Sequence, residues 1–188
     1  MIKIKNLTVK NFLSVGNVTQ GLRMDQHGLT LVLGNNLDLG GDGSRNGTGK
    51  TTIVNALSYA LYGNALTNIK KDNLINKTNN KGMMVTVEFE SNGHNYKIER
   101  GRKPNTLRFI VDDMSRDSSS TEEQQGENKE TQAEIERVIG MGHDMFKHIM
   151  ALNTYTEPFL SLRTNDQRDI IEQLLGITQL SEKATLLK

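Results

Sequence analysis

The strongest constraint on this 188-residue chain is a glycine-rich segment, residues 45–52, in which a glycine and a lysine precede two threonines. A short apolar run, residues 29–33, comes before it, and apolar side chains at helical spacing follow it. Strand, glycine-rich loop and Gly-Lys-Thr at a helix start is the arrangement of a phosphate-binding P-loop. We therefore predict a strand over 29–33 and a helix from about Gly49 to Tyr62, ended by Gly63.

Each part of this segment has a physical reason. Glycines let the backbone curl until several N–H groups point at one anion, and the helix N-terminus adds donors and a positive dipole end. Lys50 brings a full charge to the outer phosphates, and the Thr51 hydroxyl is placed to ligate Mg²⁺. The loop's usual first glycine is replaced by Ser44. We interpret residues 34–44 as an insertion ahead of the loop.

Composition narrows the class of protein. Hydrophobic residues make up 35% of the chain, which is lean for a domain that closes its own core and hints at long solvated segments or a missing partner. The net charge of +1 makes any DNA-binding surface a local patch. With no cysteine there is neither a disulfide nor a thiolate metal site. No apolar run approaches the ~20 residues of a membrane span, so we expect an intracellular protein with no membrane partner.

Alternating apolar residues predict strands over 2–10 and 18–24, then an antiparallel meander over 83–90, 94–100 and 106–111. The helix after the loop should bury one face against this sheet, with Ile53, Ala56, Leu57, Ala60 and Leu61. Residues 64–82 are polar, and we interpret them as a solvated connection or a nucleotide or DNA contact. The basic outward positions of the meander favour a solvated face, with DNA phosphates as the alternative: Lys97, Arg102, Lys103 and Arg108.

The last third of the chain is predicted to be helical. Residues 114–131 have one methionine and no other large apolar side chain, so we expect a mobile insertion there. A helix should run from about Gln132 to Gly140, and residues 143–152 should form a short helix or strand that buries Phe146, Ile149 and Met150. A further helix should start at Thr164, with Gln167 in the capping-box position. Its apolar face is formed by Ile170, Ile171, Leu174 and Leu175.

Four stretches, residues 4–14, 46–52, 85–100 and 159–176, resemble the SbcC-type ATPases in sequence and in order. These are the SMC-like subunits of DNA double-strand-break nuclease complexes, and the similarity is greatest to the large subunits of phage recombination exonucleases. The resemblance implies an α/β P-loop NTPase fold: the N-terminal lobe of an ABC-ATPase head, with an antiparallel β-meander. Residues 1–162 would form this lobe, with insertions at about 34–44 and 114–131, and residues 163–188 the start of a coiled-coil helix.

The resemblance also implies roles for residues. Leu13 stands where the family has an arginine, and Asn153 stands where it has the Q-loop glutamine. Asn153 would share Mg²⁺ with Thr51 and act in catalysis with Lys50. The implied ATP-binding residues are Ser14, Arg45, Asn46, Gly47, Thr48, Gly49, Lys50, Thr51, Thr52, Asn76 and Lys77.

In this family the Walker B carboxylates, the catalytic glutamate and the signature motif belong to a C-terminal lobe, and this sequence has no apolar run followed by Asp-Glu. The implied partners are that C-terminal lobe, a second head in a homodimer, an SbcD-type nuclease subunit and double-stranded DNA ends. ATP closure of the heads would gate access to DNA ends. Without the C-terminal lobe, hydrolysis should be weak or absent. Two alternatives stay open: an ATP-binding structural tether without turnover, and another ABC-type ATPase such as a RecF-like protein.

Overall fold

The computed structural model describes residues 2–26, 28–36, 47–112, 114–118, 124–152 and 157–177, with the side chains of 114–118 and 124–127 outside this description. The chain divides into two compact units, Met1–Val138 and Ile139–Lys188. The first unit contains the sheet and the glycine-rich loop. The second contains short helices.

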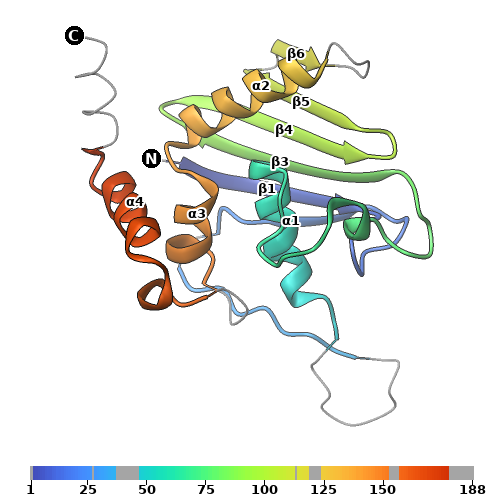
Figure 1. Cartoon of the computed structure of the whole chain (residues 1–188). Helices are drawn as coiled ribbons and strands as arrows, with labels where there is room; N and C mark the ends of the chain where they lie inside the picture. The colour runs from blue at the N-terminus through green and yellow to red at the C-terminus, as the bar shows by residue number, and fades with distance from the viewer. Residues whose placement is uncertain are drawn as a thin grey trace. The chain divides into compact units, whose positions relative to one another are not determined.

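The first unit is built on one antiparallel sheet with the strand order β2-β1-β3-β4-β5-β6 (Figure 1). The two predicted N-terminal strands and the predicted meander are confirmed. The strands are β1 (Ile2–Lys10), β2 (Gln20–Arg23), β3 (Met83–Ser91), β4 (His94–Arg102), β5 (Thr106–Val111) and β6 (Met114–Ser118).

The side chains of the central strand β3 alternate between the two faces of the sheet. Its alternate residues Val85, Val87 and Phe89 are completely buried, and the register places them beside Arg100, Ile98 and Tyr96 of β4. Burying an apolar side chain of this size contributes roughly 1.5–3 kcal/mol, so this row fixes the register and the inward face. Arg102 lies on the same face as Arg100, opposite to Lys97. Our prediction of one outward basic patch containing Arg102 is therefore wrong.

On the inward face lies α1 (Lys50–Tyr62), which contacts β3 and β4 (Figure 1). The predicted limits are confirmed, since Gly49 and Gly63 flank the helix in the left-handed region at φ 83° and 70°. Of the predicted core residues, Ile53 is only half-buried. Burial is broader than a single stripe, because residues 55–62 are all buried.

The segment after α1 explains this broad burial. Asn55 Oδ1 accepts a hydrogen bond from the Leu66 amide at 3.0 Å, and Ser58 Oγ donates to the Asn64 carbonyl at 2.8 Å. The chain then passes through the 3₁₀ turn η1 (Lys71–Leu74), in which Leu74 is fully buried. Residues 64–82 are therefore partly packed, whereas the polar composition indicated a solvated connection.

The predicted strand over residues 29–33 is wrong. Residues 28–36 form no strand, and the run is exposed, with Leu29 fully accessible and Leu33 64% accessible. A strand needs a neighbour to pair with its backbone N–H and C=O groups. No strand of the described sheet pairs with this run, so its apolar side chains stay in solvent.

Residues 114–131 also differ from the prediction. β6 pairs with β5, and α2 (Gln124–Ile139) begins about two turns before the expected start at Gln132. Backbone pairing at the edge of a sheet needs little apolar surface, and a helix of good helix formers needs only a few anchors. Ile135 and Ile139 are those anchors, and both are buried. The helix ends at the predicted Gly140, which has a φ of 73°.

The second unit consists of α3 (His143–Met145), the π-helical turn η2 (Phe146–Met150), the 3₁₀ turn η3 (Phe159–Ser161) and α4 (Thr164–Leu174). Phe146 is buried as predicted, but Ile149 and Met150 are 36% and 59% exposed. The predicted capping box is wrong. Gln167 Nε2 instead donates to the carbonyls of residues 159, 160 and 162, so it holds the preceding turn.

The apolar face predicted for α4 is mostly open, since Ile170 is buried while Ile171 and Leu174 are 44% and 55% exposed. The helix ends at Leu174, and Gly176 takes a left-handed φ of 68°. Among the described residues, no helix is both long enough and apolar enough to cross a membrane.

Candidate nucleotide-binding site

The loop before α1 has the backbone that an anion cradle requires. Gly49 is the N-cap of α1 and takes a φ of 83°, a conformation that L side chains rarely adopt. A Cβ on Gly49 would also lie 2.9 Å from Ser14 Oγ. Glycine is therefore required at this position both for backbone conformation and for space.

The N-terminus of α1 is open to an external anion. The first turn contains no acidic residue, and no side chain caps it. Lys50 is the first residue of the helix, and its Nζ donates to Thr48 Oγ1 at 3.3 Å, so the amine folds back over the loop. The dipole end, the amide donors and this amine together favour a phosphate group. The next hydroxyl, on Thr51, is exposed and accessible to a metal ion, and these residues fit ATP with Mg²⁺.

A second segment joins the loop from the end of β1. Ser14 Oγ and Thr52 Oγ1 lie 2.9 Å apart in a hydrogen bond, so two of the predicted site residues are in contact. The neighbouring Leu13 has a φ of 48° and donates its amide to the Leu74 carbonyl at 2.7 Å. Ser14 is thereby held beside the first turn of α1.

Asn76 holds this segment in place. Its Nδ2 donates to the Leu13 carbonyl at 2.9 Å, and its Oδ1 accepts hydrogen bonds from the Thr78 and Asn79 amides, each at 3.1 Å. The structure thus gives Asn76 a positioning role for the Leu13–Ser14 turn, while its predicted nucleotide contact stays a prediction. Lys77 is exposed next to it, and its predicted role is likewise untested.

One contact was not anticipated from the sequence. Gly34 lies so close to the loop that a Cβ on it would be 1.9 Å from Thr48 Oγ1. Asn36 also lies near, with Nδ2 3.9 Å from the position of a Cβ on Gly47. The end of the apolar run thus lies against the loop, although Gly34 and Thr48 are far apart in sequence. The only sequence signal for this contact was Gly34, the glycine that directly follows the apolar run of residues 29–33.

Three predicted site residues, Arg45, Asn46 and Asn153, lie outside the described residues. The predicted insertion at 34–44 also falls largely there. Among the residues that are described, no group of three or more His, Asp or Glu side chains could hold a metal ion. The structure therefore brings together Ser14, Gly49, Lys50 and Thr52, and Thr48 joins them by accepting a hydrogen bond from Lys50.

The sequence matches a family described as "AAA domain" over residues 6–188, nearly the whole chain. The chain belongs to the AAA-domain family. Exonuclease subunit 2 of Enterobacteria phage T4 is 35% identical over 188 residues, covering 99% of this chain and 30% of the T4 protein. Exonuclease subunit 2 of Escherichia phage RB69 is 34% identical over 182 residues, 96% of this chain and 29% of that protein.

More distant homologues are named as ATPases of DNA repair. A DNA double-strand break repair Rad50 ATPase of Methanocaldococcus jannaschii is 27% identical over 184 residues, covering 95% of this chain and 16% of that protein. The chain thus spans less than a third of the length of each of these relatives. The predicted similarity to SbcC-type and phage exonuclease subunits is confirmed.

The fold agrees with these relatives. A solved structure from work on ATP-driven dimerization and DNA-stimulated activation of SMC ATPases superposes with a TM-score of 0.56 at 15% identity. It covers 92% of this chain and 99% of that one. At this identity the similarity shows the fold alone, and the fold is that of the N-terminal lobe of an ABC-ATPase head.

Proposed function

We propose that this AAA-domain chain is the N-terminal, ATP-binding lobe of an SMC-like subunit in a DNA double-strand-break processing exonuclease complex. The observation that carries the proposal is the N-terminus of α1, where left-handed Gly49, the Lys50 amine and the Ser14–Thr52 pair surround one open helix end. A triphosphate chain is the ligand that such a set of donors suits.

In this proposal the chain's residues bind and orient the nucleotide. The loop amides and Lys50 hold the outer phosphates, and Thr51 directs its hydroxyl to Mg²⁺, which neutralises phosphate charge when bound. Arg45, Asn46 and Gly47 would complete the loop, while Asn76 and Lys77 would lie toward the base. Asn153 would reach the metal and the attacking water with a shorter arm than glutamine.

The exposed apolar run supports a second lobe. Leu29, Leu31 and Leu33 are 101%, 77% and 64% exposed in the run that leads to Gly34, and an unpaired apolar segment of this kind is suited to pair with strands from elsewhere. We propose that a C-terminal lobe pairs there and supplies catalytic carboxylates, and that hydrolysis is weak without it. We propose that α4, with its exposed apolar face, begins a coiled coil formed by residues 163–188. Residues 1–162 would form the ATP-binding lobe.

The wider assembly is proposed from the relatives. Two heads would close on ATP as a homodimer, and closure would gate the access of an SbcD-type nuclease subunit to double-stranded DNA ends. The setting would be recombination, repair and phage DNA replication, in the cytoplasm of the host cell. This account explains why a nucleotide site lies in a chain similar to exonuclease subunits.

A nucleotide-binding tether without turnover is the second candidate, favoured by asparagine rather than glutamine at position 153. Turnover with a matching C-terminal lobe, Mg²⁺ and DNA distinguishes the two. Activity well above that of the chain alone supports the ATPase, and background activity supports the tether.

The binding site itself is tested with Lys50→Ala and calorimetry of ATP with Mg²⁺. Binding should be lost while the unfolding free energy changes by less than about 0.5 kcal/mol, as for a surface substitution. The matched control is Lys70→Ala, which removes an exposed lysine from the turn before η1. Unchanged affinity in Lys50→Ala would show that the nucleotide binds elsewhere.

A further inference from the structure

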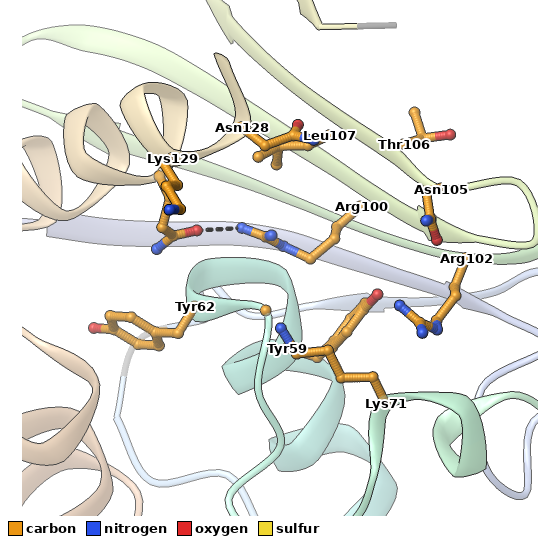
Figure 2. Close-up of a pocket in the computed structure, with 13 residues that line it drawn as sticks. Tyr59, Tyr62, Lys71, Arg100, Arg102, Asn105, Thr106, Leu107, Asn128 and Lys129 are labelled. Carbon is orange, nitrogen blue, oxygen red and sulfur yellow. Dashed lines mark hydrogen bonds between the residues drawn. The ribbon is translucent and has the colours of Figure 1, made fainter. Parts of the chain in front are cut away.

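A second cationic site lies at the opposite end of α1 from the glycine-rich loop. A pocket of about 380 Å³ opens there between α1, η1, β4, β5 and the start of α2 (Figure 2). Its volume is in the range of small-ligand sites. Thirteen residues line it, among them four lysines or arginines and no aspartate or glutamate. The lining residues therefore carry a formal charge of about +4, which the Asp72 carboxylate paired with Arg102 reduces to about +3, in a chain whose net charge is +1.

Arg100 lies deepest among these cations. Its Nε donates to the Ala60 carbonyl at 3.2 Å, and its terminal nitrogen donates to Gln132 Oε1 at 2.5 Å, the contact drawn in Figure 2. Its guanidinium also lies 6.0 Å from the centre of the Tyr59 ring. Burial lowers the pKa of Arg100 to about 10. Arg100 thus neutralises the negative end of the α1 dipole, which gives it a structural role before any ligand is considered.

This role of Arg100 does not explain why Arg102 and Lys71 line the same pocket. Arg102 Nε binds Asp72 Oδ1 at 2.7 Å on the rim. Lys71, on the adjacent turn, points into the same pocket, and among the described residues no carboxylate or carbonyl pairs with its amine (Figure 2). Partial burial lowers the pKa of Lys71, and the positive charges of Arg100 and Arg102 lower it further. An amine placed against two guanidinium groups is destabilising unless an anion joins them.

The remaining lining suits a compact polar ligand. Tyr59 and Tyr62 line the pocket from α1 with only 3% and 5% of their surface exposed. Asn105 adds an amide from the β4–β5 turn, whereas the amide of Gln132 is held by Arg100, the Leu61 carbonyl and Glu136. Such a mixture of aromatic surface and fixed polar groups is typical of a small-molecule site. A duplex is read by an extended basic stripe, whereas Lys71 lies within electrostatic reach of both Arg100 and Arg102.

We propose that this pocket binds a small phosphomonoester, whose phosphate lies between Lys71, Arg100 and Arg102 and whose body contacts Tyr59 and Tyr62. The site goes beyond the proposed function, because the 13 residues of α1 place it about 20 Å from the glycine-rich loop. Because Arg100 and Gln132 both bind carbonyls of the last turn of α1, occupancy is felt directly by the helix that begins at Lys50.

The test uses the Lys50→Ala chain, so that phosphate binding at the loop does not contribute. Calorimetric titrations with inorganic phosphate, with a deoxynucleoside 5′-monophosphate and with the unphosphorylated nucleoside separate the phosphate from the body of the ligand. Either of the first two should bind and the nucleoside should not. Tighter binding of the monophosphate than of inorganic phosphate would support the proposal, and inorganic phosphate binding as tightly as the monophosphate would overturn the contact of the ester with Tyr59 and Tyr62.

Adding Lys71→Gln to the Lys50→Ala chain should weaken binding of the phosphate ligand at least about tenfold, because one charged hydrogen bond is lost. The matched control Lys70→Gln removes the neighbouring exposed lysine and should leave affinity unchanged. Equal losses in both variants, or binding of neither phosphate ligand, would overturn the proposal. A 5′-phosphorylated duplex that binds more tightly than the monophosphate, with the same dependence on Lys71, would overturn it in favour of a DNA-end contact.

An independent readout is the Lys71 amine itself, followed by NMR of its side-chain carbon. A bound dianion should raise the lowered pKa of Lys71 toward its ordinary value, because it favours the charged amine. A pKa of Lys71 that does not move at saturating ligand would place the ligand elsewhere and contradict the proposal.

Discussion

Gly34→Ala is the most informative single substitution, because it adds one methyl group at the contact between residues 28–36 and the glycine-rich loop. The new Cβ would lie 1.9 Å from Thr48 Oγ1 and 2.7 Å from Thr48 Cβ, both far inside contact distance. Thr48 must therefore move by about 1 Å or more, since nonbonded heavy atoms pack at roughly 3.5–4.0 Å. Lys50 Nζ donates to the same hydroxyl at 3.3 Å and must lose or re-form that contact.

The expected loss is that of one charge-assisted hydrogen bond to phosphate, about 1.5–3 kcal/mol, or about 10- to 150-fold in affinity. Calorimetry of ATP with Mg²⁺ measures it directly. The unfolding free energy should change by less than about 1 kcal/mol, because residues 28–36 are mostly exposed and form no strand. A large change in binding with a small change in stability is thus the expected signature.

Two controls make this prediction strict. Gly21→Ala adds the same methyl group in β2, where the nearest side-chain atom is 3.8 Å away, and should bind ATP normally. In a Thr48→Gly background Gly34→Ala should have no further effect, because the clashing side chain is gone. If Gly34→Ala binds ATP as tightly as the unaltered chain, the contact between Gly34 and the loop does not position the phosphate site.

Three further predictions concern the frame around the site. Phe89→Ala removes a completely buried ring from β3 and should lower the unfolding free energy by about 3–5 kcal/mol in urea; a loss under about 1 kcal/mol would mean that the sheet's inward face is packed differently. Asn76→Ala should cost about 1–3 kcal/mol by the same measurement, since it leaves the Leu13 carbonyl without its donor, and an unchanged midpoint would contradict the positioning role. The hydrogen bond from His94 lowers the pKa of Asp112, so its contribution to stability is present above the unfolded value of about 3.9 and is lost as the pH falls through the lower folded value. Asp112→Asn should therefore flatten the acid limb of a stability–pH curve, and identical limbs would show that the pair does not contribute.

The parts of the fold that the sequence predicted are those governed by local pattern. Alternation fixed the inward row of β3, and two glycines that can adopt positive φ marked both ends of α1. The turn at Asn92–Gly93 between β3 and β4 followed from its residue types. These features need no information from distant parts of the chain.

The failures have a common cause in tertiary context. Residues 29–33 have the composition of a buried strand but no partner strand in the described sheet. β6 is polar, yet an edge strand is held by its backbone to β5. Arg102 looked like an outward cation, but the register of β4 places it with Arg100 on the covered face. Pattern alone does not show which side of a sheet α1 and α2 will cover.

The sequence predicted only the contiguous part of the candidate site. The loop and Lys50 follow from one motif, whereas the approach of Gly34 to Thr48 depends on where the preceding run lies in space. The role of Asn76 in holding the Leu13–Ser14 turn likewise depends on a pairing across 63 residues. Both are contacts between segments that sequence spacing does not relate.

A nucleotide-bound crystal structure tests the central claim most directly. With an ATP analogue and Mg²⁺ soaked into crystals of the 188-residue chain, we predict the terminal phosphates at the N-terminus of α1, within hydrogen-bond distance of Lys50 Nζ. The metal ion should be bound to Thr51 Oγ1. Ser14 and Thr52 should keep their 2.9 Å contact beside it. Phosphates found anywhere other than this helix end, with Lys50 still bound to Thr48, would contradict the account.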